Sequence, residues 1–394
     1  MRWNQWMRIM SVAVCAVLLV VATTQGVQAQ STSTPGSVDP ATYVPKNDVW
    51  YRAEVTAVEN SAVENEEDGT ERIMQRVTVQ IKSGDEEGRE QQINHGMDFA
   101  LREGLVVEKG DWVVLIKSET YDGSKLGEVY HIYEPYRLPA LLVAGLIFLA
   151  AVLLLGRWKG LGSVVGLGIS LLVLVKGVIP WIIRGGDPLL ACIVGSIVIA
   201  TVALFVAHGF TRRTSIAWVS TVIACCLAAV LSYGFVWVAR LYGYGSEEAY
   251  FLKTGILATL DLRGLLLGSI LIGALGILDD ITTAQVAVVE ELHHANPALT
   301  RADLYHRGLS VGREHIASLV NTLALAYAGA SFPLILLTAT NEYQPVWAAI
   351  NSEGISEEIV RTLVGSCALV LAVPITTALA AAYYGSRATG AKTR

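Results

Sequence analysis

The stretch LPALLVAGLIFLAAVLLLG at residues 138–156 decides the fold of this chain. It contains no charged side chain, and about 20 apolar residues in a helix are enough to cross the hydrocarbon core of a bilayer. Residue 138 is also where the pattern changes, because the residues before it alternate like β-strands. The stretch therefore predicts a membrane-spanning helix that follows a β-rich region.

Further apolar segments follow this one along the chain. They lie near 161–183, 188–207, 215–239, 264–285, 316–338 and 359–384. Only 16% of all residues are charged, whereas soluble domains carry roughly 25%. We expect an all-α polytopic membrane bundle of about seven helices over residues 137–385. Residues 386–394 are predicted to be a basic cytoplasmic tail.

The N-terminal residues resemble an export signal. A basic start precedes an apolar run from Ile9 to Ala22, and Val27-Gln28-Ala29 is a small-x-small cleavage pattern. Residues 1–29 are therefore predicted to be a signal peptide, with an uncleaved anchor as the alternative. Residues 30–47 are rich in Ser, Thr and Pro and are predicted to be a linker.

Residues 48–136 show the alternation of β-strands. The apolar positions of two runs are Tyr51, Ala53, Val55 and Ala57, and Val77, Val79 and Ile81. Further strands fit near 112–118 and 128–133. A period of two, interrupted by turn residues, predicts a small antiparallel β domain, either an OB- or SH3-like barrel or a sandwich.

Charge predicts the orientation in the membrane. Arginine and lysine gather in the tail and in alternate loops, and an excess of these residues marks the cytoplasmic side. We therefore expect a multi-pass protein of the plasma membrane, with the β domain outside the cytoplasm and the C-terminus inside it. Residues 30–137 hold 21 acidic and 11 basic residues, so binding of a nucleic acid is not predicted.

Two adjacent carboxylates, Asp279 and Asp280, fall in the middle of the apolar run from Gly264 to Val289. Charged residues at membrane depth are rare and are functional candidates by default. Asp280 belongs to a helical stripe of small and polar residues: Ser269, Gly273, Gly276, Asp280, Thr283 and Ala287. Membrane helices pack closely along such stripes, so we expect Asp280 to point into the bundle and Asp279 to lie on a more apolar, peripheral edge.

Other polar residues at similar depth complete the predicted site. Thr283 and Gln285 follow the aspartates, and Asn321 and Thr322 lie in the segment at 316–338. We expect Thr283, Gln285 and Asn321 to line one polar pocket with Asp280. The alternative is that these side chains only hold helices together through hydrogen bonds.

Lys176, in the segment at 161–183, has two interpretations. It is either a counter-ion for an aspartate or a side chain that extends to the membrane surface.

Other chemistries are not indicated by the sequence. The five cysteines all lie in apolar segments and form no disulfide or metal pattern. A loop predicted at 286–315 carries four histidines, but their spacing matches no metal motif. Within it, Thr300 and Asp303 predict the start of a short helix over 301–315. No catalytic motif is present, so no enzyme, metal or cofactor is predicted.

Several motifs together resemble the YibE/F-like family of bacterial multi-pass membrane proteins. They include GALGILDDITTAQ at 273–285, NTLALAYAGASFP at 321–333, HGFTRR at 208–213 and DLRG at 261–264. The resemblance extends over roughly 48–385 and implies a polytopic membrane protein with an exported N-terminal domain. In the family pattern the position of Asp280 is the acidic one. The resemblance implies no particular activity.

The residues favour a transporter or permease-like protein in which Asp280 responds to a proton or cation. Its expected partners are the lipid bilayer and an unidentified substrate or ion. The alternative is a membrane scaffold that transports nothing and uses its exported acidic domain to bind an envelope protein.

Overall fold

The computed structural model describes residues 48–385, except 65–70, 97–100, 102–104, 122–125, 256 and 341–342. The predicted signal or anchor, the linker and the tail lie outside the described residues. The chain divides into two compact units. The described residues up to Ala150 belong to one unit, and those from Ala151 onward belong to the other. Each unit is described by itself.

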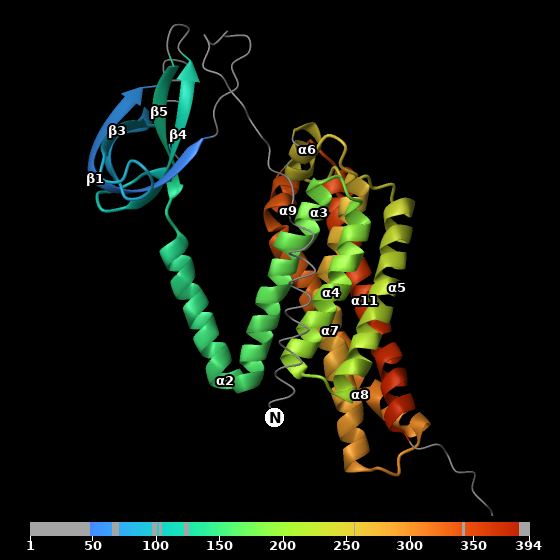
Figure 1. The fold of residues 1–394 in the computed structure, drawn as a ribbon. Helices are drawn as coiled ribbons and strands as arrows, with labels where there is room; N and C mark the ends of the chain where they lie inside the picture. Colours follow the sequence, from blue (N-terminus) through green and yellow to red (C-terminus); the bar gives the residue numbers. More distant parts are fainter. Residues whose placement is uncertain are drawn as a thin grey trace, which may run out of the picture. The chain divides into compact units, whose positions relative to one another are not determined.

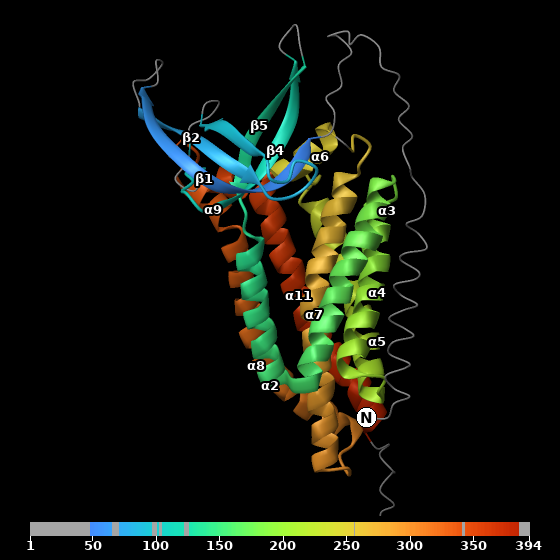
Figure 2. The same cartoon turned by 60° about the vertical axis from the view of Figure 1, so that its left-hand side comes forward.

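The strands of the first unit form one curled antiparallel sheet, a half-barrel (Figures 1 and 2). Its strands are β1 Val49–Glu64, β2 Glu71–Ile81, β3 Glu90–His95, β4 Trp112–Tyr121 and β5 Leu126–Pro135. The strand order is β3-β2-β1-β4-β5. Of the two predicted forms, the single curled sheet agrees with the barrel and not with the sandwich.

The core of this sheet follows the predicted alternation with one exception. Tyr51, Ala53 and Val55 are at most 2% exposed, and the apolar positions of β2 from Val77 to Ile81 are fully buried. Ala57 is exposed, contrary to the prediction, because the register between β1 and β2 shifts after Val55. A bulge of this kind changes which face the following residues occupy.

The second unit is a bundle of helices. The long helices are α2 Leu138–Val173, which links the two units, α4 Pro188–His208, α5 Arg212–Val238, α7 Leu262–Ala295, α8 Arg301–Ala330 and α11 Glu353–Tyr384. The short ones are η2 Leu174–Val178, a π-helix, and α3 Ile179–Ile183, α6 Glu247–Thr254, α9 Phe332–Ala339 and α10 Val346–Ile350. Six described helical segments are long and apolar enough to cross a membrane, or seven if α8 and α9 form one bent span. The predicted polytopic bundle is therefore confirmed.

The helical path is broken at two places, once inside α2 and once between α8 and α9. Arg157 interrupts α2 with non-helical angles (φ 51°, ψ −138°), which separates the segments 138–157 and 160–183. α8 and α9 meet at 67° beside Pro333, which has no N–H to continue the helix. The segment predicted at 316–338 is therefore bent.

The polar segment before that bend differs from the prediction. A capping box between Thr300 and Asp303 begins a helix, as expected. This helix is not a separate short one, because α8 continues to Ala330. α7 also continues to Ala295, so most of the loop predicted at 286–315 is helical.

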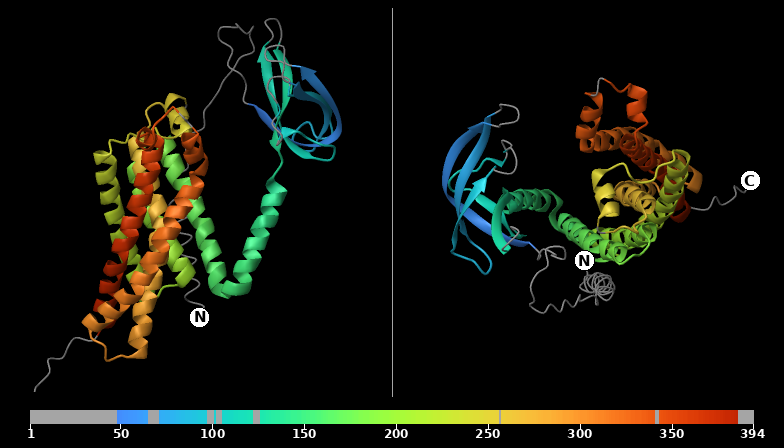
Figure 3. Two further views of the ribbon diagram at one scale, coloured as in Figure 1. Left: turned by 180° about the vertical axis from the view of Figure 1, so that it is seen from behind. Right: turned by 90° about the horizontal axis from the view of Figure 1, so that it is seen from above.

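α7 is in contact with α4, α5, α8 and α11. Figure 3 shows the helices of the bundle from two further sides. Its buried face carries large residues such as Leu271 and Leu278. The small residues that pack against this face belong to the neighbouring helices, with Ala224 on α5 and Ala368 on α11 both fully buried. Close helix packing here therefore combines a bulky helix with small-residue partners.

Candidate functional site

Asp279 and Asp280 lie near the middle of α7 and have different surroundings. Oδ1 of Asp279 is shielded from solvent and has no hydrogen-bond partner among the described residues. The side chain of Cys225 on α5 lies near Asp279 and interacts with it electrostatically. The side chain of Asp280 is exposed. The prediction that Asp280 points into the bundle and Asp279 lies at its edge is wrong, because the structure places them the other way round.

The reversal has a physical cause. No residue of the predicted small and polar stripe is fully buried, and Gly276 and Asp280 are exposed. The deeply buried face of α7 is the leucine-rich face beside Asp279, since α5 and α11 supply the small residues of the contact. The sequence of one helix does not show which member of a helix pair provides the small side chains.

The face of α7 that carries Asp280 lies between its contacts with α4 and α8. On the α8 side, a Cβ added at Gly273 would lie 3.0 Å from the hydroxyl of Tyr327. On the α4 side, His208 is within electrostatic range of Asp280. A Cβ at Gly276 would meet no described atom within 4 Å. An ionised carboxylate facing hydrocarbon is costly, so water, an ion, a ligand or another helix must cover this face.

Thr283 stays beside the aspartates on α7, whereas Gln285 does not share a pocket with Asp280. The hydroxyl of Thr283 donates a 2.8 Å hydrogen bond to the carbonyl oxygen of Asp279, within α7 itself. Gln285 is fully buried, and its Nε2 donates to the carbonyl oxygen of Gly308 on α8 and to Oγ1 of Thr377 on α11, both at 2.8 Å. Gln285 therefore joins three helices, and its prediction as a pocket residue is wrong.

Asn321 and Thr322 are exposed on α8. The Thr322 hydroxyl donates to the carbonyl oxygen of Ser318, and among the described residues no hydrogen bond joins either side chain to Asp280. Lys176 is exposed in η2, and the described residues show no ion pair between it and either aspartate. The structure thus brings Asp279, Asp280 and Thr283 together and leaves the other predicted residues apart.

A polar cluster that was not predicted from the sequence lies in the first turns of α11. Arg361 donates a 3.0 Å hydrogen bond to Oγ of Ser269 on α7 and lies 3.3 Å from Oε1 of Glu358. Tyr327 and Glu358 line the same cavity between α8 and α11. The signal available in the sequence was the single arginine within the apolar segment at 359–384.

Two further carboxylates of α11 hold a loop at the end of the bundle. Oε1 of Glu353 accepts hydrogen bonds from the N–H groups of Tyr242, Gly243 and Tyr244 at 2.6, 2.9 and 3.3 Å. Oε1 of Glu357 accepts one from Gly245 at 3.0 Å.

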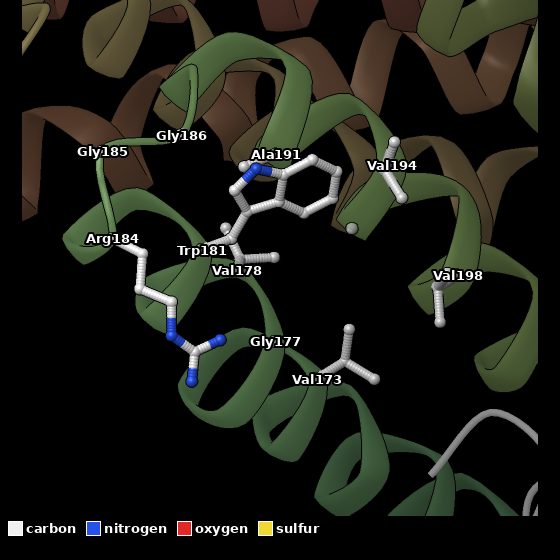
Figure 4. A pocket seen from close by; sticks show the side chains of 11 residues that line it. Val173, Gly177, Val178, Trp181, Arg184, Gly185, Gly186, Ala191, Val194 and Val198 are labelled. Atoms are coloured by element: carbon white, nitrogen blue, oxygen red, sulfur yellow. The ribbon is translucent and has the colours of Figure 1, made fainter. Parts of the chain in front are cut away.

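An apolar cavity of about 540 Å³ lies between α3 and α4. Figure 4 shows Trp181 and Arg184 from the α3 segment and Val194 and Val198 from α4 around it. Gly186 permits the position of the Trp181 ring, because a Cβ there would come within 2.0 Å of it. None of the predicted site residues lines this cavity.

A second, more polar cavity lies where α4, α7 and α11 end and α5 begins. It brings together basic and aromatic residues, among them His293 and His294 of α7. These histidines were predicted to lie in a loop and instead lie on a helix. In the described parts of the chain, no three His, Cys, Asp or Glu side chains are placed to hold a metal ion.

Long apolar helices with buried polar contacts between them, and ionisable residues at mid-span, define an integral membrane protein with a helical bundle. The family model described as YibE/F-like protein matches residues 144–386, which is more than half of the chain, and the chain belongs to this family. The match begins inside α2, so it does not include the β domain that the sequence resemblance was expected to cover. No curated protein and no solved structure matches the chain.

Proposed function

We propose that this membrane protein is transporter- or permease-like, and that the carboxylates of Asp279 and Asp280 are its ion-responsive site. One observation carries the proposal. On the helix that contacts four others, one carboxylate oxygen is enclosed without a hydrogen-bond partner among the described residues, and the next residue presents its carboxylate on an open face. Ionisable residues at membrane depth serve as proton or ion sites.

The two aspartates would divide the work of such a site. Adjacent residues of a helix are about 100° apart around its axis, so a proton or cation arriving at the open face meets Asp280 first. His208 lies on the same side and would assist proton exchange there. Oδ1 of Asp279 is shielded from solvent, and Cys225 of α5 lies near this side chain. One accessible and one enclosed carboxylate on a single helix suit a site that is exposed alternately to two sides.

Transport is a better match than catalysis. Two neighbouring carboxylates on one helix cannot face each other across a substrate, as a carboxylate pair in an enzyme would require. We therefore propose a protein that is not an enzyme. We also propose that it resides in the plasma membrane, with its β domain outside the cytoplasm, because the distribution of Lys and Arg favours this orientation.

The experiment is cation and proton flux into liposomes that contain the purified protein. Asp280→Asn keeps the shape of the side chain and removes its charge, and we expect it to abolish flux. Asp279→Asn is expected to reduce flux strongly as well. Glu291→Gln, at an exposed position near the end of the same helix, is the matched control and should leave flux unchanged. Full flux in both aspartate variants, with normal folding by size-exclusion chromatography, would exclude the proposed site.

A second candidate function is a scaffold whose β domain binds an envelope protein. The observation in its favour is a set of exposed aromatic side chains on that domain. Trp50 and Tyr133 are 52% and 53% exposed, with ring centroids 5.1 Å apart, and Trp112 lies 6.3 Å from Tyr136. Exposed aromatic residues are enriched at protein interfaces. Under this alternative, capture of a partner would depend on Trp50 and Tyr133 and would survive replacement of both aspartates.

A further inference from the structure

The ends of several helices enclose a polar cavity whose lining contains neither Asp279 nor Asp280, although it includes the His208 assigned above to proton exchange. Its volume is about 610 Å³. The helix ends around it, those of α4, α7 and α11, lie at the lower end of the bundle in Figure 1. Cavities of roughly 300–1,000 Å³ have the size of small-molecule sites. Its main polar and charged lining residues are Arg212, Arg213, Glu290, His293, His294 and Tyr383.

The cavity has more positive than negative charge. Glu290 is the carboxylate in its described lining, and both oxygens of this group have partners. Oε2 lies 3.5 Å from Nη1 of Arg213, and Oε1 accepts a 2.9 Å hydrogen bond from the hydroxyl of Tyr384. Glu290 therefore neutralises Arg213 and leaves the charge of Arg212 uncompensated.

Arg212 is positioned by an aromatic side chain and not by an ion pair with a carboxylate. Its guanidinium donates a hydrogen bond to the hydroxyl of Tyr383 and lies 5.9 Å from the centre of that ring. The described residues show no carboxylate in an ion pair with Arg212. A guanidinium has five N–H donors, so most of them remain for a ligand.

His293 adds a group that lacks a partner in the protein. Its Nδ1 is shielded from solvent and has no hydrogen-bond partner among the described residues. The ring lies 5.9 Å from that of Tyr384, which fixes its position on the wall of the cavity. A shielded polar nitrogen without a hydrogen bond is unfavourable, and a ligand oxygen would relieve that cost.

We propose that this cavity binds a phosphate group, carried either by a free phosphate compound or by the headgroup of an anionic phospholipid. Phosphate offers several acceptor oxygens, which match the planar fork of an arginine and a nearby imidazole. Basic pockets between transmembrane helices are suited to phosphate-bearing headgroups. The inference goes beyond transport, and it holds whether or not Asp279 and Asp280 carry ions.

The test measures binding to the full chain with two probes. Inorganic phosphate is added to the protein in detergent, and binding is followed by equilibrium dialysis of labelled phosphate. The protein is also placed in nanodiscs of phosphatidylcholine, with or without phosphatidic acid, and its thermal unfolding is measured. Whichever of the two probes binds, Arg212→Gln should weaken its binding at least about tenfold, because a charge-assisted hydrogen bond is lost. Arg307→Gln, an exposed arginine on α8 outside the cavity lining, is the matched control and should have no effect.

The two probes separate the two sources of phosphate. Binding of inorganic phosphate that depends on Arg212 supports a free phosphate compound. Stabilisation by phosphatidic acid alone, again dependent on Arg212, supports a lipid headgroup. Equal losses in the Arg212 and Arg307 variants, or no response to either probe, would overturn the proposal. Should Arg212→Gln fold poorly, His294→Gln replaces an exposed residue of the same lining and must also weaken binding.

Discussion

Gly312 of α8 lies directly against Gln285 of α7. A Cβ added at Gly312 would lie 3.0 Å from Oε1 of Gln285 and 2.4 Å from Cγ1 of Val373 on α11. The amide of Gln285 can bridge α8 and α11 only because this position has no side chain. Close packing of α7, α8 and α11 at this contact therefore requires a residue without a Cβ at position 312.

We expect Gly312→Ala to destabilise the bundle by about 1–3 kcal/mol, because overpacking forces the neighbouring side chains to move. Gly276→Ala is the matched control. Gly276 is also a helical glycine, but a Cβ there meets no described atom within 4 Å, and alanine favours the helix. Thermal unfolding in detergent should show a lower Tm for Gly312→Ala and an equal or higher Tm for Gly276→Ala. Equal effects of the two changes would contradict the close contact.

The carboxylate of Glu353 should control the order of the loop at 242–245. Glu353→Gln keeps the size of the side chain but removes the charge that three backbone N–H groups share. Hydrogen bonds to a charged group contribute about 1.5–3 kcal/mol, so we expect local opening rather than loss of the fold. Hydrogen exchange should become faster at Tyr242, Gly243 and Tyr244. Glu358→Gln, about one and a half turns further along α11, should leave exchange in this loop unchanged.

The β domain should lose stability as the pH falls. Burial lowers the pKa of His95 below its usual 6.5, so the unfolded chain binds the proton more readily than the folded one. The contribution of His95 is therefore complete above about pH 6.5 and declines below it. The hydrogen bond from Lys117 lowers the pKa of Glu86, whose contribution is lost at still lower pH as the carboxylate is protonated.

The measurement is urea unfolding of residues 48–136 expressed alone, which we expect to give a soluble, β-rich domain. The free energy of unfolding should fall between about pH 7.5 and about pH 5.5. His95→Gln should reduce this dependence, because glutamine does not titrate. An unchanged slope in that variant would show that another group is responsible.

The proposed orientation predicts which positions an impermeant thiol reagent can reach. Cysteines placed at Ser83 and at Tyr343, which is 98% exposed, should react in intact cells. A cysteine at Ala302, exposed near the start of α8, should react only after lysis. Reaction at Ala302 in intact cells would refute this orientation.

Features that depend on residues adjacent in the sequence were predictable. Features that depend on contacts with another strand or helix were not. The strand alternation from Val77 to Ile81 and the helix start at Thr300 follow from local chemistry, and both were predicted. β3 was missed because Ile93 is the single large apolar residue in EQQINH. The exposed position of Ala57 results from a bulge in the pairing with β2. Neither strand β3 nor the exposure of Ala57 is indicated by the residues themselves.

The aspartates show the same limit at the candidate site. Their place near the middle of a long apolar helix agrees with the prediction, because it follows from the length of the apolar run. Their orientation was not, because it depends on the alanines that α5 and α11 present to α7. Gln285 was separated from Asp280 for the same reason, since its partners lie on two other helices.

α7 runs without interruption from Leu262 to Ala295. At about 1.5 Å per residue, a helix of this length exceeds the hydrocarbon core of a bilayer, which is about 30 Å thick. One continuous helix therefore carries both Asp280 and, about three to four turns further on, the Glu290 and His293 of the basic cavity. Any ligand that tilts or slides the end of this helix displaces the carboxylates by the same motion. By thermodynamic reciprocity, loading of the carboxylates would then alter the affinity of the cavity in equal measure.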